Sequence, residues 1–383
     1  MGPAETLTLP LGDGWVLCQP DMDRLVVLNA IGKTVWDLLG GGFGQQEIAS
    51  AFAQHFGLPA ERALSNIGEV IGGLEEAGFL SRPPGEAGTE GCTQSAAPNG
   101  PAVQSGPNVH CGTFQFGDHR VHVHSSLPDI GRAYFSRFRH RALDDAADAD
   151  VLEFSGGSCG YRLTLQGAVA AEANSLAEIV GRAHGLFLSW EHPKTEFLAY
   201  FHAAAVSRGG HSVLLPGVSG TGKSTLTGYL AGQGFGYLGD DLVAMARAGW
   251  SLRPLPTCLS LKSGSWPILT GLYPRLPDLP TLQCHGRDVR YVELGQAQYA
   301  GSAPSVIMFP TYAKRGDTHL NALAPLQTMT RLLETNTDLH RPTTEATLVE
   351  FFQFVEQTPA YELVYKDLPS ARAVIEAWLD LTA

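Results

Sequence analysis

The sequence predicts an α/β protein with a small N-terminal β3α3 domain of winged-helix type and a larger mixed-sheet domain. Three observations lead to this prediction. Residues 1–84 contain three short β-like segments followed by three helical segments. Residues 85–108 are rich in Pro, Gly and Ser and predict a flexible linker, and residues 109–383 alternate between strand and helix patterns around a phosphate-loop motif.

Composition restricts the classes of function. The 383 residues are 44% hydrophobic, which is enough apolar material for more than one core. No run of about 18 apolar residues predicts a membrane span and no signal-peptide pattern opens the chain, so we expect a cytoplasmic protein. The net charge of −12 argues against binding to nucleic acid or to an anionic membrane. The six cysteines form no Cys-x-x-Cys pair, which indicates reduced thiols.

The N-terminal segment has a regular order of elements. We expect strands and then helices over the ranges Thr6–Leu11, Trp15–Gln19, Arg24–Asn29, Ile31–Leu39, Gln45–Phe56 and Pro59–Ala77. Winged-helix DNA-binding domains share this order. Residues 1–84, however, carry ten acidic and four basic side chains, and the resulting charge of −6 argues against DNA as the partner.

This segment also resembles a known peptide-binding domain. The stretches Val-Val-Leu-Asn-Ala, Val-Trp-Asp-Leu-Leu-Gly-Gly-Gly, Glu-Ile-Ala and Leu-Glu-Glu-Ala-Gly-Phe-Leu resemble the PqqD-like precursor-peptide recognition domain over about 80 residues. The resemblance implies that the leader of a ribosomally made precursor peptide adds as a strand to the edge Arg24–Leu28, beside the helix around Leu64–Leu74. The expected contacts are Leu25, Val26, Val27, Leu64, Ile67 and Ile71. The alternative is a purely structural cap, and the linker would let a bound peptide reach a separate site.

Residues 109–200 predict a mixed α/β lobe. The expected strands and helices are Thr113–Phe116, Val121–Val123, Tyr161–Leu165, Asp129–Arg141 and Ser175–Ser189. His122 and His124 share one face of a strand, which suits a metal, but no third ligand is evident. A basic cluster is either a solvated helix face or a site for an acidic peptide segment, and it consists of Arg132, Arg137, Arg139 and Arg141.

The strongest motif is a Gly-x-x-x-x-Gly-Lys-Ser phosphate loop (Walker A) that begins at Gly217. Glycines let backbone N–H groups turn toward a triphosphate, and the helix that follows adds its positive N-terminal end. Lys223 would reach the β- and γ-phosphates, while Ser224 and then Thr225 would offer oxygens to Mg²⁺. The expected nucleotide-binding residues are Gly217, Ser219, Gly220, Thr221, Gly222, Lys223, Ser224 and Thr225. ATP, or another nucleoside triphosphate, and Mg²⁺ are therefore the expected cofactors.

The elements around the loop are unusual for a nucleotide-binding protein. Phe201–Val206 and Ser212–Leu215 are joined by a link too short for a parallel crossover, so they predict a hairpin, and Ser224–Gln233 predicts a helix. Phe235–Met245 predicts a strand that carries Asp240 and Asp241 on opposite faces. Adjacent carboxylates in a buried strand suit the metal and base roles of phosphoryl transfer, and a solvated turn is the alternative.

The hairpin, the loop, the acidic pair and His202 together resemble the HPr serine kinase family over residues 109–383. The resemblance implies a P-loop kinase domain in which Asp240 is the acid/base, Asp241 helps hold Mg²⁺ and His202 lies near the reacting groups. It is compatible with a homo-oligomer. Thr225 stands where the bifunctional kinase/phosphorylases carry glutamate, and the segment for their reverse reaction has no clear counterpart. Leu259–Lys262 and Val306–Pro310 are similar to later parts of the family pattern.

The C-terminal part shows no residues with obvious chemistry, so we interpret it as structural scaffold. Its expected strands and helices are Leu320–Leu323, Leu326–Thr335, Glu345–Gln357, Tyr361–Tyr365 and Pro369–Leu381. We therefore expect an ATP–Mg²⁺-dependent kinase that phosphorylates a hydroxyl, most simply a serine, of a precursor peptide captured by the N-terminal domain. The alternatives are a kinase for a carrier protein or a small hydroxy compound, and a nucleotide-gated peptide chaperone without phosphoryl transfer.

Overall fold

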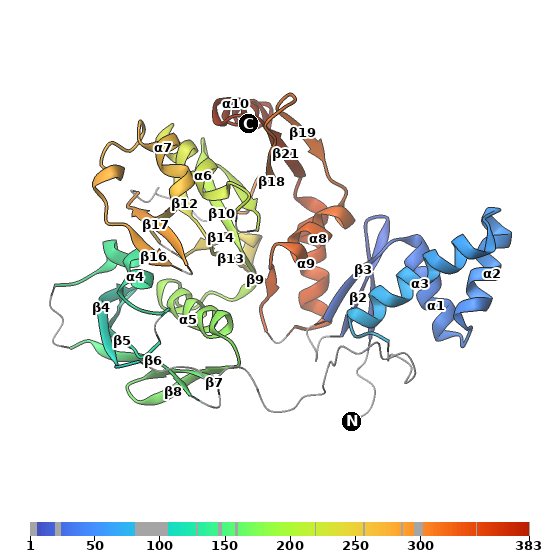
Figure 1. The fold of residues 1–383 in the computed structure, drawn as a ribbon, viewed down its shortest axis with the longest axis horizontal. Coiled ribbons are helices and arrows are strands. Elements are labelled where there is room, and N and C mark those ends of the chain that lie inside the picture. Colours follow the sequence, from blue (N-terminus) through green and yellow to red (C-terminus); the bar gives the residue numbers. More distant parts are fainter. Residues whose placement is uncertain are drawn as a thin grey trace. The chain divides into compact units, whose positions relative to one another are not determined.

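The computed structural model describes residues 6–19, 24–80, 106–127, 129–144, 148–157, 160–218, 220–255, 257–284, 286–294, 302–341 and 343–382. The chain forms two compact units, and many of their helices and strands are labelled in Figure 1. The N-terminal unit comprises Met1–Thr93, Leu323–Leu333 and Leu339–Pro359, and the phosphate-loop unit comprises Gln94–Ala322, Glu334–Asp338 and Ala360–Ala383. Most of the expected linker lies outside the described residues. No helix in these described ranges is long and apolar enough to cross a membrane.

The N-terminal unit contains the expected β3α3 arrangement. Its antiparallel sheet has the order β1-β2-β3, and its elements are β1 (Leu7–Leu11), β2 (Gly14–Gln19), β3 (Arg24–Leu28), α1 (Ala30–Gly40), α2 (Gln45–Phe56) and α3 (Ala60–Glu76). Leu17 and Leu28 pack with Leu74 of α3 in one core. The Asn29 side chain caps α1 by accepting a hydrogen bond from the Gly32 N–H at 2.8 Å. The predicted β3α3 unit is therefore confirmed.

Two further helices complete this unit from far along the chain, α8 (Pro325–Glu334) and α9 (Glu345–Gln357). The Gly12 N–H donates to Glu356 Oε1 at 3.0 Å, and a Cβ added at Gly14 would lie 2.5 Å from Leu326 Cδ2. Side chains alternate along β2, so Val16 faces away from the α1–α3 core, yet it is fully buried. The second face of the sheet is thus covered by helices that the sequence pattern assigned to scaffold.

Gly14→Ala tests this cover. We expect it to destabilise the protein by about 1–3 kcal/mol, because the methyl group would overlap Leu326 and the Leu28 carbonyl. Denaturant unfolding of the full chain measures the loss. Gly72→Ala in α3 is the matched control, since its added Cβ meets nothing within 4 Å and should be neutral or stabilising. If Gly14→Ala lowers the free energy of unfolding by the same amount in a Leu326→Ala background as in the wild type, Leu326 of α8 is not the residue that the added methyl group overlaps.

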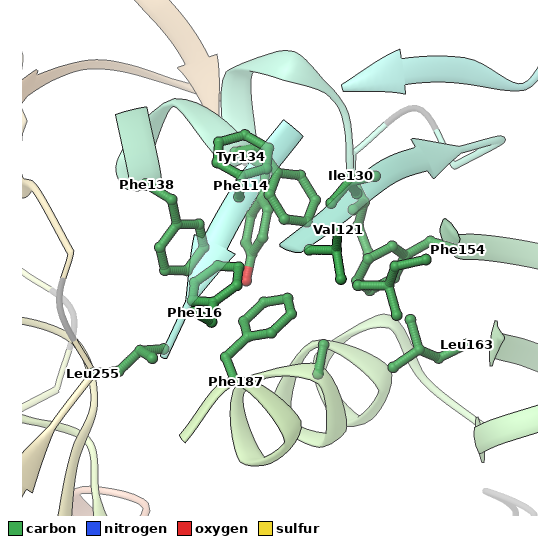
Figure 2. Close-up of a cluster of buried hydrophobic side chains, with 14 of the residues drawn as sticks. Phe114, Phe116, Val121, Ile130, Tyr134, Phe138, Phe154, Leu163, Phe187 and Leu255 are labelled. Carbon is green, nitrogen blue, oxygen red and sulfur yellow. The ribbon is translucent and has the colours of Figure 1, made fainter. Parts of the chain in front are cut away.

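The first half of the phosphate-loop unit is a lobe built on a five-stranded sheet, here named the β4–β8 lobe. Its elements are β4 (Val109–Phe116), β5 (His119–Ser125), α4 (Arg132–Phe135), η2 (Ser136–Arg141), β6 (Asp150–Gly157), β7 (Gly160–Leu165), β8 (Ala168–Ala173) and α5 (Leu176–Glu191). Figure 2 shows Phe114, Phe138 and Phe187 in its aromatic core, with Tyr134 among them. The expected helix Asp129–Arg141 is wrong, because only one short α-helical turn forms before a 3-10 segment.

A six-stranded mixed sheet in the order β12-β10-β11-β18-β21-β19 carries the phosphate loop. Its strands and helices are β10 (Ala203–Arg208), β11 (His211–Pro216), α6 (Lys223–Gly232), β12 (Gly236–Gly239), β18 (Val306–Tyr312), β19 (His319–Ala322), β21 (Ala360–Tyr365) and α10 (Leu368–Thr382). Strands β10 and β11 pair antiparallel, as the short link predicted, while β11 and β18 run parallel. Leu226 and Leu230 of α6 pack against this sheet in one core.

Two smaller sheets complete the unit, one in the order β14-β13-β9-β20 and one in the order β15-β17-β16. Their strands and the nearby short helices are β9 (Phe197–Phe201), β13 (Val243–Ala246), η3 (Ala248–Trp250), β14 (Leu252–Pro254), β15 (Leu259–Lys262), η4 (Ser263–Ser265), α7 (Trp266–Leu269), η5 (Leu276–Asp278), β16 (Leu282–Cys284), β17 (Arg287–Val292) and β20 (Asp338–Leu339).

The chain changes sheet at two neighbouring points, and this corrects two expected strands. Phe201–Val206 divides into β9 and β10 at His202, and Phe235–Met245 divides into β12 and β13 at the acidic pair. Strand β9 pairs with β13, and β10 pairs with β12, so both breaks fall at the same level of one antiparallel ladder. Asp241 has a φ of +74°, in the left-handed region. The acidic side chains therefore project from a bend, and not from opposite faces of a strand.

Candidate functional site

The phosphate loop lies between a strand and a helix, as the motif requires. It leaves β11 at Gly217 and enters α6 at Lys223. Gly220 and Gly222 adopt φ values of +105° and +89°, which only glycine adopts readily. A Cβ at Gly222 would also lie 2.9 Å from the Tyr365 hydroxyl. The two glycines are therefore needed for the path of the loop, while the expected site residue Ser219 lies outside the described residues.

Lys223 connects the loop to the break between β9 and β10. Its side chain is buried, and Nζ donates to the Gly217 carbonyl at 3.1 Å and to the His202 carbonyl at 3.4 Å. Thr225, two residues further along α6, shares a 2.6 Å hydrogen bond with the Ser265 hydroxyl. The loop cation and the hydroxyls that follow it are thus held beside the sheet-changing segments.

Asp240 is a buried carboxylate at 2% exposure. Neither of its oxygens has a hydrogen-bond partner of acceptable geometry among the described residues. Burial, helped by the charge of Asp241, raises the pKa of Asp240 to about 6. Lys223 and the nearby Ser224 hydroxyl act in the opposite direction on this pKa. A buried carboxylate with no partner is costly, and a cation or a proton would satisfy it.

Asp241 has a different environment, because its side chain is 37% exposed. Its carboxylate lies 3.8 Å from the Arg137 guanidinium of η2, which is itself only 11% exposed. Burial pushes the pKa of Asp241 upward, but the positive charges of Arg137 and Lys223 outweigh it and hold the pKa below its ordinary value. Asp241 is therefore ionised near neutral pH and faces a cation from the β4–β8 lobe.

His202 is held by the backbone of the acidic pair. Its Nδ1 lies 3.0 Å from the Asp241 carbonyl oxygen, which can only accept, so Nδ1 carries the proton. Burial, followed by the charge of Lys223, lowers the pKa of His202. The ring is therefore neutral near pH 7, with Nε2 available as a hydrogen-bond acceptor.

Two adjoining cavities meet at these residues. A cavity of about 220 Å³ lies over the phosphate loop, and we name it the loop cavity. A cavity of about 540 Å³, here the lobe cavity, is lined by residues of the β4–β8 lobe, including Tyr134 and Arg137. Asp241 lines both cavities and Asp240 lines neither. The residues common to both are His202, Ser224, Asp241, Ser260 and Lys262. The structure therefore brings together the expected site residues Lys223, Ser224, Asp241 and His202.

The sequence pattern missed several residues of the lobe cavity. Arg137 stood out only as one of four arginines, yet its guanidinium stacks 4.3 Å above the Tyr134 ring. The Tyr134 hydroxyl in turn contacts His184 Nε2 at 2.5 Å. Arg141 instead pairs with Glu191 at 3.2 Å, and the Arg132 side chain lies outside what is described. Arg287 also lines this cavity, as does Lys262, which belongs to the segment Leu259–Lys262 that resembles the kinase family pattern. The strand pairings place the two residues on neighbouring strands, β17 and β15.

The histidines expected as metal ligands lie on the β4–β5 hairpin. A third histidine, His110, joins them, with its ring centroid 5.0 Å from that of His124 and 6.0 Å from that of His122. His122 Nδ1 shares a 2.8 Å hydrogen bond with Thr113 Oγ1. Within the described ranges, no group of three or more His, Cys, Asp or Glu side chains is placed to hold a metal ion.

The expected peptide-binding residues divide into two groups. Strand β3 pairs only with β2 among the described strands, and Leu25 and Val27 on it are half-buried. On α3, Leu64 is 38% exposed and Ile71 is half-buried. Val26 and Ile67 instead pack into the cores, and Ile67 is only 2% exposed. The edge of β3 and the outer side of α3 are therefore the surfaces that a peptide could contact.

Comparison with known families finds a match over residues 14–80. That segment matches the family described as "Coenzyme PQQ synthesis protein D (PqqD)". A search of curated proteins found no match to the chain. Residues 14–80 therefore form a PqqD domain, and this agrees with the β3α3 arrangement of the N-terminal unit.

Proposed function

We propose that this protein is an ATP–Mg²⁺-dependent kinase that phosphorylates a hydroxyl, most simply a serine, of a precursor peptide whose leader is captured by the PqqD domain. The observation that carries the proposal is the placement of Asp241 in the wall shared by the loop cavity and the lobe cavity. A phosphoryl group that is transferred from a nucleotide in the loop cavity to an acceptor in the lobe cavity must pass beside Asp241. PqqD domains bind precursor peptides, which supports a peptide as the acceptor.

The residues of the loop cavity fit a nucleotide with its metal. Backbone N–H groups of the loop and Lys223 would bind the phosphates. Ser224, which lines the cavity, would hold Mg²⁺ together with Asp240, which lies beside Ser224 but does not itself line the cavity. Magnesium prefers oxygen ligands, and the partnerless carboxylate of Asp240 beside a hydroxyl supplies them. When bound, Mg²⁺ would neutralise charge on the transferred phosphoryl group and on the departing diphosphate.

The residues of the shared wall fit the acceptor side of the reaction. Asp241 would accept the proton of the acceptor hydroxyl as its oxygen bonds to the γ-phosphorus, and ADP would leave. His202 would orient the acceptor through Nε2. This assignment exchanges the roles of Asp240 and Asp241 that the kinase resemblance implied, because Asp240 is buried beside Ser224 and lines neither cavity.

Mass spectrometry tests the proposal directly. Short peptides encoded beside the gene are incubated with the full chain and ATP–Mg²⁺, and we expect one of them to gain the mass of a phosphoryl group. Nucleotide binding with leader binding but no mass change in any peptide would favour the peptide chaperone. Phosphorylation of a folded carrier or of a small hydroxy compound, with all the peptides unchanged, would favour those acceptors.

Leu64→Glu tests the capture of the leader. Leu64 is an exposed apolar side chain on α3 next to the expected groove, so a charge there should weaken leader binding to the full chain at least tenfold. Isothermal titration with the leader of the modified peptide gives the affinity. Val349→Glu on α9 is the matched control, because Val349 has a similar exposure of 39% and lies outside the groove. Equal affinity in both variants would remove α3 from the binding surface.

A further inference from the structure

The transfer step depends on the direction in which the Asp241 carboxylate points, and a buried cation, Arg137, lies beside that carboxylate. Building on the proposed function, we infer that Arg137 is a positioning residue for Asp241. Its guanidinium holds the carboxylate toward the acceptor hydroxyl, and Tyr134 with His184 holds the guanidinium. The β4–β8 lobe thereby takes part in the reaction, although the phosphate loop lies outside it.

The place of Asp241 in the chain leaves its carboxylate free to turn. The residue lies at the bend between β12 and β13 with a φ of +74°, and its side chain is 37% exposed. Such a side chain has several rotamers open to it, and a base that must meet a hydroxyl at hydrogen-bond distance needs one of them. The ion pair with Arg137, 3.8 Å away, favours the rotamer in which the carboxylate faces the lobe cavity.

Arg137 can direct a neighbour because it is itself fixed. Its side chain is only 11% exposed, and its guanidinium stacks 4.3 Å from the centre of the Tyr134 ring. Nε donates to the Tyr134 carbonyl at 3.3 Å, and the Arg137 carbonyl accepts from the Cys258 N–H at 2.7 Å. The planar guanidinium is therefore in place before any substrate binds, so holding Asp241 costs little further side-chain entropy.

Tyr134 and His184 anchor the stacked guanidinium in the lobe. The Tyr134 side chain is 3% exposed and lies in the aromatic core that Figure 2 shows. Burial raises the pKa of Tyr134 and lowers that of His184 to about 3, so both are neutral and the Tyr134 hydroxyl donates to His184 Nε2 at 2.5 Å. Since His184 belongs to α5, these contacts join α5 to the reacting carboxylate, and all four residues line the lobe cavity.

The geometry favours a role through Asp241 over direct contact with the phosphates. Arg137 lines the lobe cavity and is not among the residues that line the loop cavity, where Lys223 lies. Its guanidinium also pairs with Asp241, so a role on the phosphoryl group would require it to leave this partner. The two roles differ in a double variant, because a residue that acts through Asp241 has little left to contribute once that carboxylate is gone.

Arg137→Met in the full chain tests the inference, because methionine keeps much of the length of the side chain and removes the charge. With the encoded peptide that gains a phosphoryl group as substrate, we expect kcat to fall about 10–10²-fold, since a misplaced base slows transfer. The KM for ATP–Mg²⁺ and the affinity for a non-hydrolysable ATP analogue should stay within about twofold of the wild type, and Arg137→Lys should recover part of kcat. In an Asp241→Asn background, Arg137→Met should lower kcat by less than about twofold.

Arg141→Met is the matched control, because Arg141 lies on the same 3-10 segment, pairs with Glu191 at 3.2 Å and lines neither cavity. It should leave kcat close to that of the wild type. If Arg137→Met does not fold, Arg137→Lys carries the same double-variant comparison. A normal kcat in Arg137→Met, or a loss that adds in full to the loss caused by Asp241→Asn, would overturn the inference and leave the kinase proposal standing. A wild type that transfers no phosphoryl group to any encoded peptide would defeat the kinase proposal itself.

Discussion

Lys223→Ala is expected to lower ATP-dependent phosphoryl transfer by about 10²–10³-fold or more, because it removes the one cation buried within the phosphate loop. Without Nζ, the loop would keep its backbone N–H groups but lose the charge that positions the β- and γ-phosphates. Single-turnover transfer to the modified peptide and titration with the ATP analogue together measure the loss.

Two controls make the Lys223 result specific. Lys223→Arg keeps the charge and should retain more activity than the alanine variant. Titration with the leader should be unchanged in both, since we propose that the leader binds to the PqqD domain. Removing Nζ also leaves the carbonyls of Gly217 and His202 without this donor. Denaturant unfolding should therefore show that the free energy of unfolding falls by only about 1 kcal/mol. Near-normal transfer by a folded Lys223→Ala protein would remove the loop from the reaction.

Asp241→Asn is expected to slow transfer by about 10²–10⁴-fold while ATP–Mg²⁺ still binds, because the carboxamide keeps the shape of the side chain but cannot accept the hydroxyl proton. The side chain lines both cavities, so its loss should act on the transfer step. Single-turnover kinetics at saturating nucleotide isolates that step.

Asp240→Asn is the natural comparison for this variant. If Asp240 holds Mg²⁺ with Ser224, its amide should raise the Mg²⁺ concentration needed for nucleotide binding and transfer. Transfer at full speed by Asp241→Asn at saturating Mg²⁺, with slow transfer by Asp240→Asn, would restore the roles that the kinase resemblance implied. His202→Ala should cost less than Asp241→Asn if the ring only orients the acceptor.

Local patterns predicted the parts of the fold that depend on nearby residues. The β3α3 order, the helix bounds of Gln45–Phe56 and Glu345–Gln357, and the hairpin before the phosphate loop all follow from periodicity and link length. The path of the phosphate loop depends on glycines at single positions, which adopt positive φ values. The sequence predicts these features because each depends on residues that lie close together along the chain.

The features that were missed depend on pairing between distant segments. A run of apolar residues such as Phe201–Val206 gives no sign that it changes sheet at His202, because both halves are buried strands. Arg137 and Arg287 reach one cavity from η2 and from β17, and no spacing in the sequence relates them. The expected placement of the acidic pair on opposite faces of one strand was wrong for the same reason, since alternation holds only inside a continuous strand.

The cover that α8 and α9 provide for the β1–β3 sheet also constrains how the gene could have been assembled. A stand-alone PqqD-type segment moved to the start of another enzyme by recombination would bring Leu11, Val16 and Cys18 without the helices beside them. Three buried apolar side chains would then meet water, at a cost of several kcal/mol at about 25 cal/mol per Å². Any exchange of this domain between genes must therefore carry residues from beyond position 322, or replace that sheet face at the same time.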